Sequence, residues 1–197
     1  AAQTRGPAVA GKNCLKADDP RRVVRVGQAI ADALNARGIP AVHETSLIDL
    51  GNYNDAYPRM AGLAEDWLAR YPSIQMVLDV HRDSLETDDG AQLALRADVD
   101  GEACAKLLLV MGSNGSGLEH PGWRQNLANA ARLQALCEQR APGLMRDLLL
   151  RASRYNQHLT PRSMLLEVGT AGNSLEEALR SADIFSQVLA DCLLGKA

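Results

Sequence analysis

Residues 74–83 read Ile-Gln-Met-Val-Leu-Asp-Val-His-Arg-Asp, and the rest of the chain is arranged around them. Its first half is short, aliphatic and preceded by Tyr71-Pro72, a pattern typical of a buried strand. We expect the charged residues from Asp79 onward to lie where that strand ends. In a mostly parallel sheet, ligands collect outside the carboxyl ends of the strands, so His81 is placed to bind a metal or a substrate. The alternative is a structural histidine that is hydrogen-bonded to its carboxylate neighbours.

Helical and strand patterns alternate on both sides of this stretch. Apolar residues at helical spacing predict four helices: one from Pro20 to before Gly38, one over 60–68, one over 123–137, and one that begins with a capping box at 174–177. Further strands are expected over 40–43 and 164–169, with a hairpin-like pair over 91–95 and 103–111. This order predicts an α/β layered domain with a largely parallel sheet.

The composition is that of one soluble globular domain. The 197 residues suffice for one hydrophobic core, with 46% hydrophobic and 23% charged residues. A net charge of -3 indicates no basic surface for nucleic acid. No apolar segment reaches the roughly 20 residues that span a bilayer. Residues 1–197 are expected to form a single domain, with 1–19 as an irregular or truncated N-terminal segment.

A second strand carries a carboxylate where an apolar residue is expected. Glu167 interrupts the run 164–169, and a buried charge is costly without a partner. We expect Glu167 and His81 to meet at the same edge of the sheet. Histidine and glutamate in one cleft suit metal-assisted hydrolysis, in which Zn²⁺ polarises a carbonyl and glutamate moves the proton. The alternative is a structural hydrogen-bonded pair.

A series of motifs runs along nearly the whole chain, from about Val23 to Leu194. They are Val24–Gly27, Tyr53-Asn54 with Tyr57, Asp79–Asp83, His120-Pro121-x-Trp123-x-x-Asn126, Pro142–Leu144, Arg154–Leu159, Leu166–Gly169 and Gly172–Ala178. In this order they resemble the stage II sporulation protein P family of peptidoglycan hydrolases. The resemblance is specific as a joint pattern, although no single motif is.

The resemblance implies a three-layer α/β fold whose mostly parallel, twisted sheet is flanked by helices, as in bacterial amidases (phosphorylase/hydrolase-like). It also implies a zinc-dependent N-acetylmuramoyl-L-alanine amidase that cuts peptidoglycan, and some family members also cut peptide cross-links. In that scheme His81 is the second metal-binding histidine and Glu167 is the glutamate beside the metal. Arg154, Asn156 and His158 match a segment along the substrate groove.

The resemblance further implies a place of action and partners. The family works on the cell-wall side of the membrane during engulfment of the forespore, with sporulation proteins D and M. We expect membrane attachment only through an N-terminal anchor helix absent from this chain, and no nucleic-acid partner.

One family feature is missing from the sequence. The first zinc histidine of the family lies in a His-Thr-His motif upstream of the first helix, and residues 1–22 contain no histidine. Three explanations stay open: the chain begins late, a segment is missing from it, or this is a degenerate member. Asp19 is the candidate replacement ligand. The alternative function is therefore a degenerate or incomplete domain that binds peptidoglycan or partner proteins without cutting.

Overall fold

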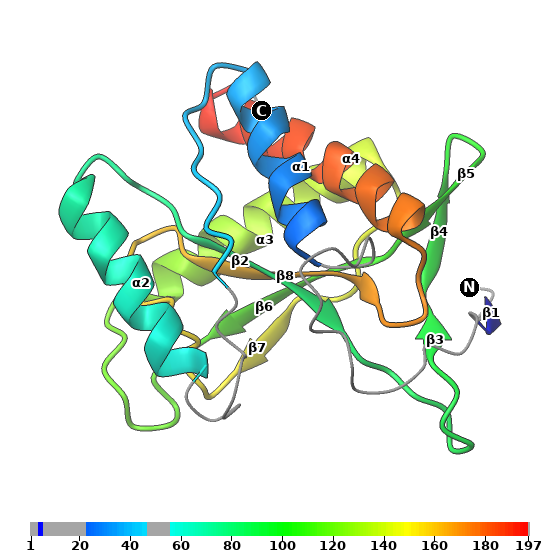
Figure 1. Ribbon diagram of the computed structural model, residues 1–197, viewed down its shortest axis with the longest axis horizontal. Coiled ribbons are helices and arrows are strands. Elements are labelled where there is room, and N and C mark those ends of the chain that lie inside the picture. The colour runs from blue at the N-terminus through cyan, green and yellow to red at the C-terminus, as the bar shows by residue number, and fades with distance from the viewer. Residues whose placement is uncertain (1–3, 6–22, 47–55, 197) are drawn as a thin grey trace.

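The computed structural model describes residues 4–5, 23–46 and 56–196, which form a mixed sheet with helices packed against it (Figure 1). The helices are α1 (Val23–Ala36), α2 (Ala56–Arg70), α3 (Trp123–Arg140) and α4 (Leu175–Leu193). The strands are β1 (Thr4–Arg5), β2 (Leu78–Asp83), β3 (Leu93–Ala94), β4 (Arg96–Val99), β5 (Glu102–Ala105), β6 (Leu107–Gly112), β7 (Leu149–Arg151) and β8 (Met164–Thr170). The predicted α/β class is confirmed.

Four strands form the main sheet, in the order β2-β8-β6-β7. β2 runs parallel to β8 and β6 runs parallel to β7, but β6 runs antiparallel to β8. The sheet is therefore mixed, although most of its pairs are parallel. For the next strand of the sheet to run parallel to β2, the chain must first cross to the other end of the sheet, usually through a helix. Here the chain forms β3, β4 and β5 at the carboxyl end of β2, so β6 begins at that end and runs back.

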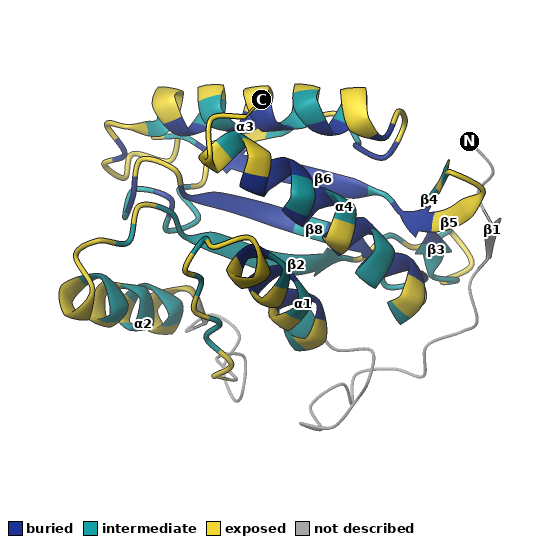
Figure 2. Ribbon diagram, turned by 90° about the horizontal axis from the view of Figure 1, so that it is seen from above, coloured by how far each residue is buried: buried dark blue, intermediate teal, exposed yellow. Residues whose placement is uncertain are grey.

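One face of the sheet carries the main hydrophobic core. Alternate residues of β6 and β8 point to this face, and α1, α3 and α4 cover it (Figure 2). Its largest fully buried side chains are Leu107, Leu109, Met111, Leu133, Leu144, Leu166 and Phe185. Burial of apolar surface, at roughly 25 cal/mol per Å², is the main stabilising term. These helices keep a polar outer face, and none in the described parts of the chain is long and apolar enough to cross a membrane.

The opposite face of the sheet carries a smaller apolar cluster. Leu108, Val110 and Leu165 are buried there, with Leu149 and Tyr155 packed against them. No helix among the described residues contributes a buried side chain to this cluster, but α2 reaches its edge, where the ring centroids of Tyr57 and Tyr155 are 6.0 Å apart. Helical cover of this face, among the residues that the structure describes, is therefore limited to α2. α2 itself lies beside the ends where β2 and β8 begin, and lines a small pocket with their first residues.

The predicted first helix forms, but the predicted strand after it does not. α1 ends just before Gly38, whose φ of 77° lies in the left-handed region that favours glycine. The segment 40–43 is irregular because its polar groups bond to α1 instead of to a strand. The Asn35 side chain donates to Ala41 O and accepts from Ala41 N, each at 3.0 Å. Asp19 and Pro20, at the predicted start of this helix, lie outside the described residues.

The central strand begins later than predicted and includes the charged residues. β2 spans Leu78–Asp83 because β8 pairs with it along its whole length. The predicted hairpin also has different bounds: β4 and β5 pair around a turn at Asp100 and Gly101, which both have positive φ. The segment 107–111, predicted as part of that hairpin, instead belongs to β6 of the main sheet.

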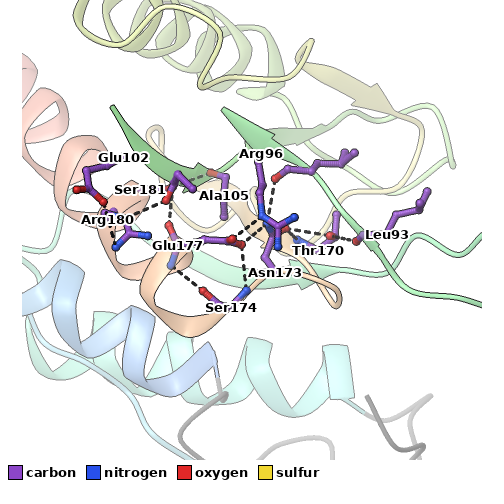
Figure 3. A network of polar contacts seen from close by, with 12 residues as sticks. Leu93, Arg96, Glu102, Ala105, Thr170, Asn173, Ser174, Glu177, Arg180 and Ser181 are labelled. Atoms are coloured by element: carbon purple, nitrogen blue, oxygen red, sulfur yellow. Dashed lines mark hydrogen bonds and ion pairs between the residues drawn. The ribbon is translucent and has the colours of Figure 1, made fainter. Parts of the chain in front are cut away.

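A polar network fixes the turn between β8 and α4 (Figure 3). Ser174 and Glu177 form the predicted capping box at the start of α4. Glu177 also pairs with Arg96 of β4 and accepts from Asn173 at 2.8 Å. Asn173 Oδ1 in turn accepts from the backbone N–H of Thr170 at 2.9 Å. The carboxyl end of β8 is thereby tied to the β4–β5 hairpin.

Candidate metal and acid–base site

β2 places its polar residues on the sheet face opposite the main core. Asp79, His81 and Asp83 alternate with residues such as Val80 that pack against that core, because side chains two positions apart on a strand share a face. His81 lies opposite Glu167 in the parallel pairing of β2 and β8. Adjacent strands are only about 4.8 Å apart. The structure therefore brings the two residues together, on the face of the sheet rather than beyond the strand ends.

The imidazole of His81 is held by Asp79. His81 Nε2 lies 2.9 Å from Asp79 Oδ1, and the His81 side chain remains 41% exposed. Burial lowers the pKa of His81, but the hydrogen bond with Asp79 and the charges of Asp79 and Glu167 outweigh it, so the pKa is raised. The ring is thus oriented by a carboxylate while part of it stays accessible.

Glu167 is a carboxyl group with an unsatisfied oxygen. Its Oε2 is buried and forms no hydrogen bond. Burial raises the pKa of Glu167 to about 7, against the lowering effect of the neighbouring His81. A carboxyl group that titrates near neutral pH can both accept and return a proton. A buried oxygen without a partner is costly, so this atom needs a water, a metal ion or a substrate group.

Two arginines bind groups that lie near His81 and Glu167. Arg146 Nη1 lies 2.5 Å from Asp83 Oδ2, so the carboxylate of Asp83 already has a cationic partner. Arg82 donates from the other side of β2 to the carbonyl oxygens of Thr170 and Ala171, at 2.8 and 3.1 Å. It therefore holds the end of β8, the strand that carries the glutamate.

A β-bulge interrupts the strand pairing directly after His81 and Glu167. The next pair of residues is shifted by one position on β8, so β8 contains one extra residue there. Gly169 lies in this bulge with a φ of 71°, and a Cβ atom at that position would be 2.8 Å from the Cβ of Ala105. Glycine therefore fits both the backbone conformation and the space. Bulges bend a strand and redirect nearby side chains, and this bulge follows Glu167 directly in β8.

The segment 152–163 carries the three residues predicted along a substrate groove. Asn156 lines the small pocket beside α2 together with Asp79, and its Nδ2 donates to a backbone carbonyl of α2 at 2.9 Å. Arg154 Nη1 donates to a backbone carbonyl before α3 at 3.2 Å. His158 has a buried Nδ1 without a hydrogen bond, and burial, followed by the charge of Arg154, lowers its pKa. Asn156 alone of the three lines the pocket that Asp79 also lines.

Buried amide side chains anchor this segment to the sheet. Gln157 is 1% exposed, donates to Val110 O at 2.9 Å and accepts from Gly112 N at 2.8 Å. Asn126 Nδ2 donates to the backbone carbonyl of Gln157 at 2.7 Å. The close approach requires a glycine, because a Cβ on Gly112 would lie 2.5 Å from Ser153 O. The dense polar residues of this segment thus serve in part to hold it against β6.

The donor atoms around His81 are of the types that bind zinc, but there are too few of them for a usual zinc site. Imidazole nitrogen and carboxylate oxygen are zinc ligands, and the orphaned oxygen of Glu167 is a free donor beside them. Catalytic zinc sites usually have three protein ligands. Within residues 4–5, 23–46 and 56–196, no group of three or more His, Cys, Asp or Glu side chains is placed to hold a metal. Asp19, the predicted further ligand, lies outside these ranges.

The other histidines do not supply the missing zinc ligands. The chain has four histidines, and all of them lie in the described ranges. His43 Nδ1 is 3.1 Å from Gln28 Oε1 of α1, a local contact. His120 and His158 lie near each other, and each has its pKa lowered by burial. A zinc site built on His81 would therefore draw its remaining protein ligands from carboxylates or cysteines of this chain, or from residues outside it.

The sequence predicts, as one alternative, a hydrogen bond between His81 and its carboxylate neighbours, and the structure shows that bond with Asp79. What the predicted strand end leaves out is that Asp79, His81 and Asp83 recur at the two-residue spacing of one strand face. Extending the predicted strand through Asp83 would have put all three on that face. The pairing of Asp83 with Arg146 has no comparable signal, since the two lie 63 positions apart.

Comparison with known proteins agrees with the motifs in the sequence. The family model described as Stage II sporulation protein P (SpoIIP) matches residues 9–190. A curated protein, stage II sporulation protein P of Bacillus subtilis (strain 168), is 32% identical over 184 residues, covering 86% of this chain and 43% of that protein. The chain thus spans less than half the length of this relative. No solved structure matches the chain. With nearly all of its length matched, this chain belongs to the stage II sporulation protein P family.

Proposed function

We propose that this chain is the hydrolase domain of a zinc-dependent N-acetylmuramoyl-L-alanine amidase that acts on peptidoglycan. The observation that carries the proposal is the cross-strand pair of His81 and Glu167, in which Glu167 has a buried, unsatisfied oxygen and a pKa of about 7. Membership of the stage II sporulation protein P family supports it. Perturbed titratable groups beside a metal-type donor are typical of hydrolytic sites.

In this proposal Glu167 handles the proton. It accepts a proton from the water that attacks the lactyl carbonyl carbon, as the new carbon–oxygen bond forms. It then gives that proton to the nitrogen of L-alanine, as the carbon–nitrogen bond breaks. Its raised pKa suits both steps, because the carboxyl group is neither firmly ionised nor firmly protonated near neutral pH.

His81 is the proposed metal ligand, with Glu167 beside it. A zinc ion bound there supplies a Lewis acid that polarises the scissile carbonyl and lowers the pKa of a water molecule. Because the described residues provide too few ligands, the proposal requires others, with Asp19 as one candidate. Arg154, Asn156 and His158 are proposed to contact the substrate, and Asn156 has the strongest support because it lines a pocket with Asp79.

The proposed setting follows from family membership. We propose action on the cell-wall side of the membrane during engulfment, with peptidoglycan as ligand and sporulation proteins D and M as partners. Cleavage of peptide cross-links is a further proposed activity.

A second candidate function is a domain that binds peptidoglycan or partner proteins without cutting. The observation that favours it is the lack of a third metal donor near His81 among the described residues. A site with one histidine and one or two carboxylates is expected to bind zinc weakly. Such a domain would keep this face of the sheet for binding but would not hydrolyse peptidoglycan.

The test is product analysis after incubation of purified peptidoglycan with the chain and Zn²⁺. An amidase releases stem peptides with a free L-alanine amine, which mass spectrometry identifies, whereas an endopeptidase opens cross-links. We expect Glu167→Gln to lower the release by at least about 100-fold, the usual contribution of a general acid–base group. The matched control is Glu176→Gln, which makes the same change at an exposed position of α4. Binding to sacculi without release of peptides would instead support the second function.

A further inference from the structure

We propose that the small pocket beside α2 is the subsite for the side chain of L-alanine, the first residue of the peptidoglycan stem peptide. The inference rests on the proposed function for its ligand, and it adds which part of that ligand the pocket takes. The pocket lies between α2 and the first residues of β2 and β8, and the segment 155–163 closes its third side.

The pocket is continuous with the site that carries His81. Asp79 lines the pocket, and its Oδ1 lies 2.9 Å from His81 Nε2. Tyr155 also lines it and packs on the apolar cluster that includes Leu165. Leu165 and Glu167 are two positions apart in β8, so they share a face of the sheet. A substrate group in the pocket is therefore next to the residues that are proposed to act on the scissile bond.

The size and lining of the pocket suit a small, uncharged side chain. Its volume is about 40 Å³, which holds about three water molecules at roughly 10–15 Å³ each. Its walls are mainly apolar and include Met60 and Ala64 of α2, with Leu78 and Met164 at the strand starts. An aromatic ring is too large for this space, and the carboxylate of Asp79 repels an acidic side chain. A methyl group satisfies both limits.

Asn156 supplies a hydrogen-bond acceptor in the wall of the pocket. Its Nδ2 donates to the backbone carbonyl of Tyr57 in α2 at 2.9 Å, whereas its Oδ1 accepts no hydrogen bond within residues 4–5, 23–46 and 56–196. An amide that is fixed through its nitrogen holds its oxygen in a defined direction. Small apolar pockets with a few fixed polar groups are typical ligand sites. One alanine residue can fill the pocket with its methyl group and donate its N–H to Asn156.

The turn that carries Asn156 has a costly backbone conformation. Tyr155 and Asn156 have positive φ values of 50° and 55°, and the N–H of Gln157 donates to Arg154 O at 3.0 Å. Asparagine tolerates this conformation, but an aromatic residue rarely adopts it. The buried side chain of Gln157 holds the turn against β6. Strain of this kind is concentrated at sites that hold ligands, and here it places Tyr155 and Asn156 together in the pocket wall.

The test uses methionine methyl groups as reporters. Met60 lines the pocket, whereas Met111 and Met145 are buried in the main core. The protein is labelled with carbon-13 at these methyl groups, and N-acetylmuramoyl-L-alanyl-D-isoglutamine is titrated into it in EDTA, so that binding is observed without hydrolysis. We expect the NMR signal of Met60, assigned with Met60→Leu, to shift, while the signals of Met111 and Met145 stay in place. No shift at Met60 overturns the inference.

The first residue of the probe is then varied. Glycine in place of L-alanine removes one buried methyl group, so the dissociation constant should rise about fourfold. L-Glutamate or L-phenylalanine at the same place should raise it by at least about tenfold, because the first is repelled and the second does not fit. Equal affinity for the four probes would mean that the pocket does not hold this side chain, and would also overturn the inference.

A variant that fills the pocket tests its location. Ala64→Leu enlarges a side chain in the pocket wall and should weaken binding of the L-alanine probe by at least about tenfold. Unchanged signals of Met111 and Met145 show that the core of this variant is intact. The matched control, Ala69→Leu, makes the same change at an exposed position of α2 and should bind the probe as the wild type does. Wild-type affinity in Ala64→Leu overturns the inference.

These measurements separate the inference from the proposed function. If the side chain of the probe controls binding as expected, but the chain with Zn²⁺ releases no peptide from peptidoglycan, the subsite stands and the proposed hydrolysis is refuted. If peptide is released but Met60 does not respond to the probe, the function survives and the inference is wrong.

Discussion

The buried carboxyl group of Glu167 should make the metal-free protein less stable as the pH rises. Its pKa in the folded protein is about 7, against an ordinary value of 4.5, with burial as the first cause. A carboxyl group whose pKa is raised by folding binds its proton more tightly in the folded state. Its contribution to stability is therefore fully present below about pH 4.5 and is lost as the pH rises through about 7.

The magnitude can be worked from that interval of about 2.5 pH units, each equivalent to about 1.4 kcal/mol. This sets an upper value of about 3–4 kcal/mol. Glu167 is only partly buried and His81 offsets part of its charge, so we expect about 1–2 kcal/mol. Glu167→Gln, which cannot ionise, should thus become more stable relative to the wild type by that amount between pH 5 and pH 8.

Urea unfolding in EDTA at the two pH values measures this difference. His81 also has a raised pKa, which acts in the same direction, but it is present in both proteins and largely cancels in the comparison. Glu176→Gln on the exposed face of α4 is the control, and its stability relative to the wild type should not change with pH. A constant difference between Glu167→Gln and the wild type from pH 5 to pH 8 would refute the reasoning, because it would mean that Glu167 ionises as freely when folded as when unfolded.

Two further predictions concern the framework around the site. Gly169→Ala should lower the free energy of unfolding by more than about 1 kcal/mol, because this position combines a positive φ with a close contact. Gly38→Ala is the control, since Gly38 has a positive φ in open space and its replacement should cost only about 1 kcal/mol. Equal losses in urea unfolding would show that the contact beside the bulge relaxes. Gln157→Ala should cost about 2–3 kcal/mol, because it leaves two buried backbone groups of β6 unpaired, and unchanged stability would mean that water replaces the amide.

Helices were predicted more accurately than strands. The helical periodicity and the capping box at Ser174 are local signals, and both appear in the structure close to their predicted bounds. The predicted strand over 40–43 failed because Asn35 of α1 takes up the polar groups of Ala41. Strand pairing depends on distant partners, which a local pattern does not contain. The same limit applies to β2, whose pairing with β8 carries it through the charged residues.

The direction of β6 also required the tertiary structure. β6 is buried on both faces, so its residues are apolar throughout, and this pattern does not indicate whether the strand pairs in a parallel or an antiparallel direction. What determines its direction is the path of residues 84–106, which stay at one end of the sheet. The sparse helical cover of the second face, where α2 reaches only the edge of the apolar cluster, has a similar explanation. An amphipathic pattern predicts that a helix is covered on one side, but not which face of the sheet covers it.

Residue types and their order along the chain predict the α/β class, the family, and the two residues on which the proposed chemistry depends, His81 and Glu167. Local periodicity and motifs carry this information. The folded protein adds that the two residues lie opposite each other on one sheet face, that Asp79 holds the imidazole, and that one oxygen of Glu167 is buried without a partner. Register, burial and pKa depend on which distant segments pack together, so no local pattern contains them.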